Sequence, residues 1–220
     1  SIVTTSSNGY RDETGYEQQK LHIAHLTEVG GWAMRNSLTA TNLNQETGGF
    51  VGGFEAYDDG DLRDTNPNPE AYRDAWSLRA SSQLTKDAWV LKPYLRRSQM
   101  RFLQHFLPGQ PLEENEQTSV GLIAERSYEF DSVGFVAGTH IEYMTGALRE
   151  FQAGPTAGSA FLVATRPSGL HYDYDVDSLM AAAYYNLTKD FTERTRFIHS
   201  LRLEHLAYDY DNHHLVGNTR

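Results

Sequence analysis

The segment from Trp89 to Pro111, WVLKPYLRRSQMRFLQHFLPGQP, constrains the fold more than any other part of the sequence. Its first eight residues alternate between an apolar side and a mostly polar side, which is the pattern of a half-buried β-strand. The pattern predicts a strand of about eighteen residues, whereas strands in soluble proteins usually have about 5–6. It ends in the loop-forming run Leu107–Pro111. A strand of this length suits the wall of a barrel that crosses a bilayer and continues above it.

Composition narrows the class of protein. The 220 residues include no cysteine and carry a formal net charge of −10, with a mean hydropathy of −0.57. The lack of cysteine argues against a disulfide scaffold, a Cys-ligated zinc and a thiol nucleophile. Net acidity argues against nucleic-acid binding, because there is no basic stripe to neutralise phosphates. No apolar run approaches the roughly 18 residues of a transmembrane helix, but barrel strands keep a low hydropathy because lipid-facing and polar residues alternate.

The alternation recurs along the chain and is interrupted by two kinds of connection. Short turns are expected near residues 30, 87, 132 and 192, the first of them at Gly30-Gly31. Long loops rich in Gly, Pro and acidic residues are expected at 47–75 and 153–177. The pattern predicts an all-β chain with about eight complete antiparallel strands in four hairpins. Outer-membrane barrels show this asymmetry, with short periplasmic turns and long external loops.

The positions of the aromatic and charged residues along the sequence also indicate a barrel. Aromatic residues cluster near the short turns, as at Trp32, Trp89 and Phe135, and at the loop ends, as at Trp76 and Phe106. Two such levels are typical of the girdles at bilayer interfaces. The face opposite the apolar residues carries many charges: Arg35, Arg79, Lys92, Arg96, Glu125, Glu129, Glu142, Arg202 and Glu204. Because unpaired charges are costly in a packed core, we expect this face to line a wet lumen or to seat another polar domain.

Five segments resemble the TonB-dependent outer-membrane receptors. They are GYRDETGYEQQKL (9–21), NQETGGFVGGFEAY (44–57), NPNPEAYRDAWSLR (66–79), PYLRRSQMRFLQHFLPGQPLEENEQ (93–117) and LRLEHLAYDYDNHHLVGNTR (201–220). The resemblance implies a barrel of about 22 strands with an N-terminal plug. It also implies import of a scarce nutrient, such as a ferric siderophore, haem or cobalamin, driven by the TonB–ExbB–ExbD complex. We expect residues 1–220 to be about eight to nine strands of one barrel domain, with the plug domain and the C-terminal strands outside the chain.

No catalytic or metal-binding motif is convincing. The run His171–Asp177, HYDYDVD, could gather carboxylates around a hard cation. It lacks the Gly and the distal Glu of a calcium loop, however, and a strand with an acidic lumen face would have the same sequence. The Gly-rich run 48–53 lacks the Lys of a phosphate loop, and no Ser–His–acid set can be chosen from spacing. We therefore expect no enzyme, no metal and no cofactor.

We expect the ligand-contacting residues to lie in the long loops and on the upper lumen wall, because receptors of this kind bind their ligands through aromatic side chains and a few charged side chains. The candidates are Tyr57, Tyr72, Arg73, Arg101 and His105.

The resemblance thus implies an active-transport receptor in the outer membrane of a Gram-negative bacterium, whose cargo the residues do not identify. Two alternatives stay open. A passive porin would have the same strands without energy coupling. A soluble, secreted all-β binding module or hydrolase would pack its apolar stripes, such as Val120/Leu122 and Phe135/Ile141, into a second layer. A barrel would expose those stripes to lipid.

Overall fold

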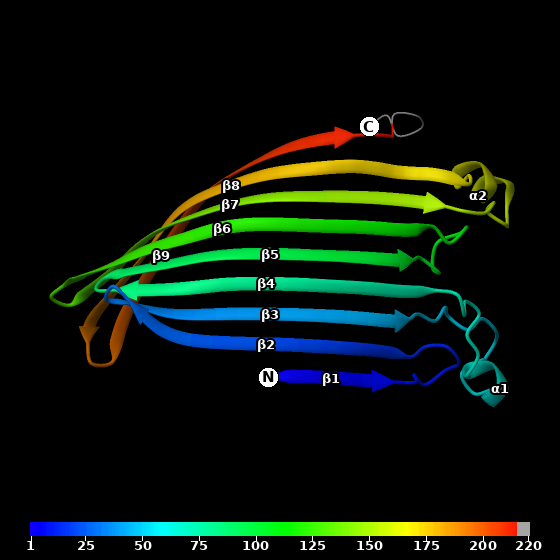
Figure 1. The fold of residues 1–220 in the computed structure, drawn as a ribbon, viewed down its shortest axis with the longest axis horizontal. Coiled ribbons are helices and arrows are strands. Elements are labelled where there is room, and N and C mark those ends of the chain that lie inside the picture. The colour runs from blue at the N-terminus through cyan, green and yellow to red at the C-terminus, as the bar shows by residue number, and fades with distance from the viewer. Residues whose placement is uncertain (215–220) are drawn as a thin grey trace.

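The computed structural model describes residues 1–214, which form one antiparallel sheet of nine strands. Each strand pairs with the strand before and after it in the sequence, so the sheet is a simple meander (Figure 1). The strands are β1 (Ile2–Ser7), β2 (Tyr16–Val29), β3 (Trp32–Glu46), β4 (Tyr72–Lys86), β5 (Trp89–Leu103), β6 (Leu112–Phe130), β7 (Val133–Gln152), β8 (Gly169–Thr192) and β9 (Thr195–Asn212). The expected fold class, an antiparallel β-barrel segment of eight to nine strands, is confirmed. No helix within residues 1–214 is long and apolar enough to cross a membrane.

Short and long connections lie at opposite ends of the sheet (Figure 1). All four predicted hairpins are present, and each has a two-residue turn. Gly30 and Gly31 both have positive φ, as does the first turn residue at Asp87 and Asp131. Positive φ is what the primed turns favoured in hairpins require. The other end carries the two long connections, with the short helices α1 (Gly60–Arg63) and α2 (Ala160–Thr165).

Three expected boundaries were wrong. The long loop expected at 47–75 ends at residue 71, since β4 begins at Tyr72. The strand that begins at Trp89 has 15 residues and ends at Leu103, because the N–H of Gln104 turns to donate to the Pro111 carbonyl at 2.9 Å and closes a short loop. The last long loop ends at residue 168, since β8 begins at Gly169. The run His171–Asp177 therefore belongs to the strand ladder.

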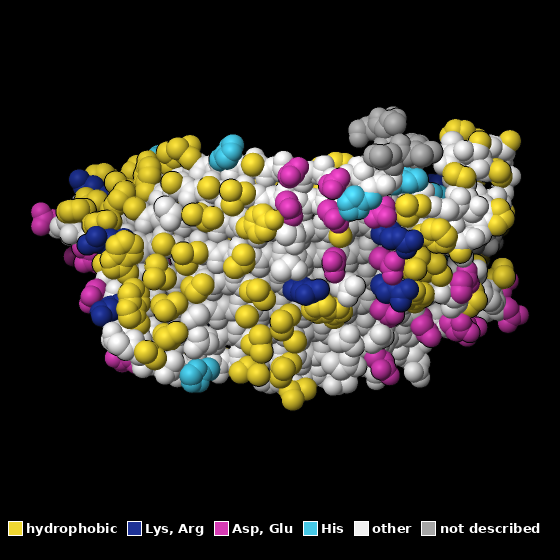
Figure 2. All heavy atoms as spheres, turned by 45° about the horizontal axis from the view of Figure 1, so that its top comes forward, with side chains coloured by type: hydrophobic (Ala, Val, Ile, Leu, Met, Phe, Trp, Pro, Cys, Tyr) yellow, Lys and Arg dark blue, Asp and Glu magenta, His cyan; other side chains and the backbone are white. Residues whose placement is uncertain are grey.

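The register gives the sheet two different faces, because directly paired residues share a face. Leu95, Val120, Tyr143 and Leu179 are paired across β5–β8 and lie on one face, here called the outer face. Figure 2 shows that apolar side chains gather over the half of this face nearer the short turns, and that acidic ones gather toward the loop end. The outer face carries no second layer within residues 1–214: Val120 is 53% exposed and Ile141 54% exposed. The packing expected of a soluble sandwich is absent from these stripes.

The aspartates of HYDYDVD lie on the outer face, whereas the sequence suggested an acidic lumen face. Asp177 pairs with Asp209, and Asp175 with Asp211, on the same side of the sheet as Leu179. Period two decides this placement, because residues two apart along a strand point to the same side. The tyrosines between the aspartates, Tyr172 and Tyr174, therefore point to the opposite, inner face.

Candidate functional site

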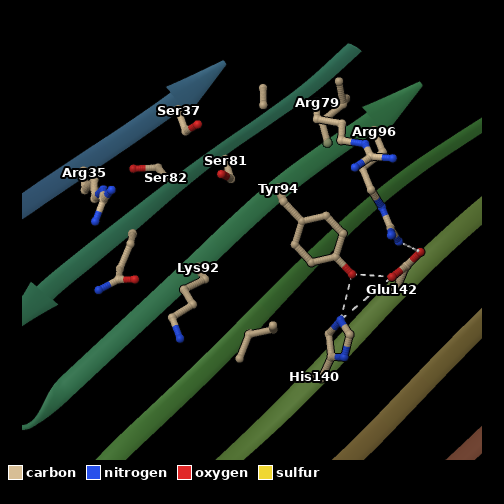
Figure 3. Close-up of a pocket in the computed structure, with 14 residues that line it drawn as sticks. Arg35, Ser37, Arg79, Ser81, Ser82, Lys92, Tyr94, Arg96, His140 and Glu142 are labelled. Atoms are coloured by element: carbon tan, nitrogen blue, oxygen red, sulfur yellow. Dashed lines mark hydrogen bonds and ion pairs between the residues drawn. The ribbon is translucent and has the colours of Figure 1, made fainter. Parts of the chain in front are cut away.

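The inner face is polar, and its central feature is a side chain that crosses a whole strand. Tyr94 of β5 pairs with Gly121 of β6, and a Cβ on Gly121 would collide with the tyrosine ring. The ring uses that space to reach β7 (Figure 3), where its hydroxyl donates to the Glu142 carboxylate and lies 2.7 Å from Nε2 of His140. Arg96 also donates to Glu142, and its Nε donates to Ser119 at 3.0 Å. Glycine on β6 is therefore what allows β5 and β7 to be linked.

A second tyrosine makes the reciprocal crossing. Tyr184 of β8 lies over Gly138 of β7, where a Cβ would also collide with the ring, and donates to Glu125 of β6 at 2.9 Å. Glu125 also pairs with Lys92 of β5 at 3.0 Å. The two tyrosines bind strands β5 to β8 through side chains as well as through the backbone ladder.

His140 connects this network to β9. An NH2 group of Arg202 lies 3.3 Å from Nδ1 of His140. A guanidinium group has no acceptor, so Nδ1 must accept this hydrogen bond and the ring proton sits on Nε2, facing Tyr94. Arg202 also pairs with Glu204 at 2.6 Å. A network of side-chain hydrogen bonds and ion pairs therefore extends across the inner face from β5 to β9.

Charges are not matched on the part of the inner face formed by β3 and β4. Arg35 and Arg79 have no hydrogen bond or ion pair with any residue in 1–214, and both are exposed. Arg79 stands directly opposite Arg96, a like-charge pair across strands. Both free guanidinium groups line a hollow of about 570 Å³, together with Tyr94, Arg96 and Glu142. This part of the wall is therefore positively charged and open.

A second hollow, of about 670 Å³, lies at the loop end and unites two of the five candidate ligand residues. Tyr57, from the loop before β4, and His105, from the loop after β5, both line it. Nδ1 of His105 is buried with no partner among the described residues, and so is Nε of Arg11 in the same hollow. Tyr10, Phe50 and Arg63 complete an aromatic and cationic lining that the sequence did not predict. Their loops lack a period, so spacing could not indicate that they meet.

The other three candidates do not line this hollow. Tyr72 and Arg73 are the first residues of β4. Arg73 lies on the inner face and donates to Gln45 at 2.6 Å, whereas Tyr72 lies on the outer face. Arg101 also lies on the outer face, where it pairs with Glu114 at 3.0 Å.

Sequence reasoning also missed a group of tyrosines on the inner face of β8 and β9, near the loop end. Tyr172, Tyr174, Tyr208 and Tyr210 all point to this side. The rings of Tyr174 and Tyr210 lie 5.1 Å apart. The alternation of Tyr with Asp in the sequence indicates that the two residue types lie on opposite faces of the sheet. Which face carries the tyrosines depends on the register of the strands.

No group of three or more His, Asp or Glu side chains within residues 1–214 is arranged to hold a metal ion. Around His213, carboxylate oxygens of Asp173, Asp175 and Asp211 lie 3.4–3.7 Å from the ring nitrogens.

A single antiparallel sheet with two-residue turns at one end, long loops at the other, an apolar outer band and a charged inner face defines a segment of a transmembrane β-barrel. Several solved structures have a similar fold. The chain resembles the ferric citrate transporter FecA in its unliganded form, with a TM-score of 0.70 and 13% identity. It also resembles the ferric-catecholate import receptor Fiu of E. coli K12 (TM-score 0.62, 12% identity) and pyoverdine-bound FpvA of P. aeruginosa (TM-score 0.65, 9% identity).

Each likeness covers 96% of this chain but only 33%, 37% and 33% of the FecA, Fiu and FpvA chains, respectively. The chain thus spans about a third of the proteins whose fold it shares. No protein-family model matches the sequence, and no curated protein matches it. At these identities the likeness establishes the fold.

Proposed function

We propose that this chain is the central part of an outer-membrane receptor of the TonB-dependent class. In this proposal the parent protein binds a ferric siderophore or a similar metal complex and imports it with energy from TonB–ExbB–ExbD. It transports and does not catalyse. The observation that carries the proposal is the fold likeness, over 96% of the chain, to three proteins described as a ferric citrate transporter, a ferric-catecholate import receptor and a pyoverdine-binding protein.

The loop-end hollow supports ligand binding in the same protein. It combines exposed aromatic rings with cationic groups, including Tyr57, which is 71% exposed. Two polar atoms at this hollow, Nε of Arg11 and Nδ1 of His105, are buried and have no partner within residues 1–214. Metal chelates bury apolar edges and present charged oxygens, which this combination suits. We assign Tyr57 and His105 as ligand contacts, and the inner-face tyrosines near Tyr174 as a further contact surface.

The test is uptake of ⁵⁵Fe-labelled ferric citrate and ferric-catecholate complexes by iron-limited cells that express the parent protein as their only iron receptor. Uptake of at least one complex is expected, and it should cease in cells that lack TonB. Tyr57→Ala combined with His105→Ala should reduce uptake of that complex at least tenfold. Phe161→Ala is the matched control, because Phe161 is equally exposed, at 72%, but lies in α2 outside the hollow.

Two results would contradict the proposal. Uptake that persists without TonB would identify a passive porin. A parent protein that is recovered from the soluble fraction, with no shift in gel mobility on boiling, would exclude a membrane barrel.

A further inference from the structure

Charged side chains on the outer face are divided between the two ends of the sheet. Within residues 1–214, every carboxylate that the strand registers place on this face lies on the loop-end side of the row from Leu95 to Leu179, as Glu116 and Asp177 do. On the short-turn side of that row the charged side chains, histidines aside, are Lys86, Arg126 and Lys189. The strands near the short turns therefore present only cations on this face.

The acids of the short turns do not neutralise these cations. Asp87, Asp131 and Glu193 lie between the strands, and among the described residues none of them forms an ion pair with Lys86, Arg126 or Lys189.

Arg126 of β6 lies between two aromatic rings. It pairs across the strands with Trp89 of β5, and Tyr128 lies two residues along on the same side. The guanidinium carbon is 5.1 Å from the centroid of each ring. Arg126 is exposed and forms no hydrogen bond or ion pair with any residue in 1–214. Contact with a ring face uses no N–H group, so its donors stay unpaired.

Lys86 of β4 flanks Trp89 on the other side. Its ammonium donates to the Gly30 carbonyl at 3.1 Å, which uses one of its three N–H donors. Lys86, Trp89 and Arg126 thus form a row across three strands. With about 4.8 Å between neighbouring strands, the backbones of the two cations are about 10 Å apart.

Aromatic rings continue from Arg126 across the sheet to β9. Neighbouring ring centroids lie 5.7–6.4 Å apart along the series Tyr128, Phe135, Tyr185, His199, Phe197 and Phe191. At its far end Nζ of Lys189 is 5.2 Å from the centroid of the Phe191 ring. A belt of rings with cations at both ends is typical of the level at which a bilayer meets water.

The surroundings of Arg126 match one class of ligand. A guanidinium group fits two oxygens of a phosphate, and a cation on a lipid-facing wall needs a counter-charge. Toward the middle of the sheet, Leu91, Leu122 and Ala124 form an apolar surface on the same face, against which acyl chains can lie. A phospholipid uses both the charge and this surface, whereas inorganic phosphate uses the charge alone. The lack of carboxylates leaves the ammonium group of a zwitterionic lipid without a partner.

We propose that the row Lys86–Trp89–Arg126 binds the phosphate of an anionic glycerophospholipid in the leaflet on the short-turn side of the membrane. The inference rests on the membrane barrel of the proposed function and goes beyond its cargo and energy source. Its subject is the selectivity of the wall for one lipid charge.

The test is photocrosslinking of the parent protein in vesicles of equal parts phosphatidylglycerol and phosphatidylethanolamine. A benzoylphenylalanine crosslinker in place of Leu91 reports on the lipid beside the row, and mass spectrometry of the adduct identifies it. Adducts with phosphatidylglycerol should exceed those with phosphatidylethanolamine about fivefold, and Arg126→Gln should abolish most of that excess. Gel mobility before and after boiling verifies that each variant is folded.

Arg97→Gln is the matched control. Arg97 also lies on the outer face with its guanidinium over an indole, 5.8 Å from the Trp76 centroid, but at the loop end and 3.8 Å from Glu116. Its removal should leave the excess unchanged. Added inorganic phosphate should have no more effect than sodium chloride of the same ionic strength.

Equal adducts with the two lipids in the unmodified protein would overturn the inference. So would an excess that survives Arg126→Gln, an equal loss in Arg97→Gln, or a loss caused specifically by inorganic phosphate. Lipid selectivity requires no TonB. An excess that persists where uptake is independent of TonB would defeat the proposed transport mechanism alone, whereas TonB-driven uptake without the excess would defeat this inference alone.

Discussion

Tyr94 links β5 to β7 because the residue beneath its ring is a glycine. The register alone places Gly121 there, and any Cβ at that position would meet the ring. The hydrogen bonds at the ring tip, to Glu142 and His140, depend on the ring lying flat across β6. Glycine usually weakens a strand, so its presence in the interior of β6 is explained by this close approach.

We expect Gly121→Ala to destabilise the barrel by about 1–3 kcal/mol, because the ring must move and its polar partners lose their hydrogen bonds. Urea unfolding of the parent protein in detergent, followed by gel mobility, measures the change. Gly134→Ala is the control, since nothing lies within 4 Å of a Cβ there. In a Tyr94→Ala background the Gly121→Ala substitution should cost much less. An undiminished cost in that background would show that the ring is not the cause.

At the scale of the strand, alternation decides which side chains meet lipid. Leu122 of β6 pairs with Ile141 and Pro93 on the outer face, whereas its neighbour Ile123 pairs with Lys92 and His140 on the inner face. These two residues are adjacent and similar in size. Substitutions at these two positions therefore compare the two faces of the sheet at almost the same position along the strand.

We expect Leu122→Arg to destabilise the protein by about 2–4 kcal/mol, because it places a charge at membrane depth on the lipid face. Ile123→Arg should change stability far less, since that side chain faces the polar lumen. The free energy of unfolding in lipid vesicles is the relevant measurement. If both substitutions were equally harmful, both faces of β6 would be buried, as in a sandwich.

The alternation and the turn residues made the strands, the hairpins and the two faces predictable, because each of these features is local in sequence. The inner-face network was not predictable from the sequence. Its contacts join residues far apart in the chain, such as Tyr94 and Glu142, which meet only once the registers of two strand pairs are fixed. The charges of this face were predicted individually, but which of them remain unpaired, as Arg79 does, depends on those registers. The loop-end hollow could not be predicted for a different reason. Its residues come from loops whose sequences have no regular period, so spacing does not indicate which of them meet.

At the scale of the whole molecule, the described sheet has two open edges. Among residues 1–214, β1 and β9 each pair with a single strand. In the hydrocarbon region no water is available to the backbone groups of an open edge, and each unsatisfied group costs several kcal/mol. In a bilayer both edges must therefore be paired, and we propose that further strands of the parent protein pair with them. The FecA, Fiu and FpvA chains, of which it matches about a third, are long enough to include such strands.

The 220-residue chain, refolded alone into detergent micelles, should therefore fail to give a compact monomer whose gel mobility shifts on boiling. The parent protein should give one under the same conditions. Refolding the chain together with the remaining segments of its parent should restore the shift, because the added strands pair with β1 and β9. The unmodified chain and a variant with Leu122→Arg should behave alike when refolded alone, as neither forms a closed wall. A compact, heat-modifiable monomer from the chain alone would mean that its two edges can pair with each other, and that the nine strands form a complete small barrel.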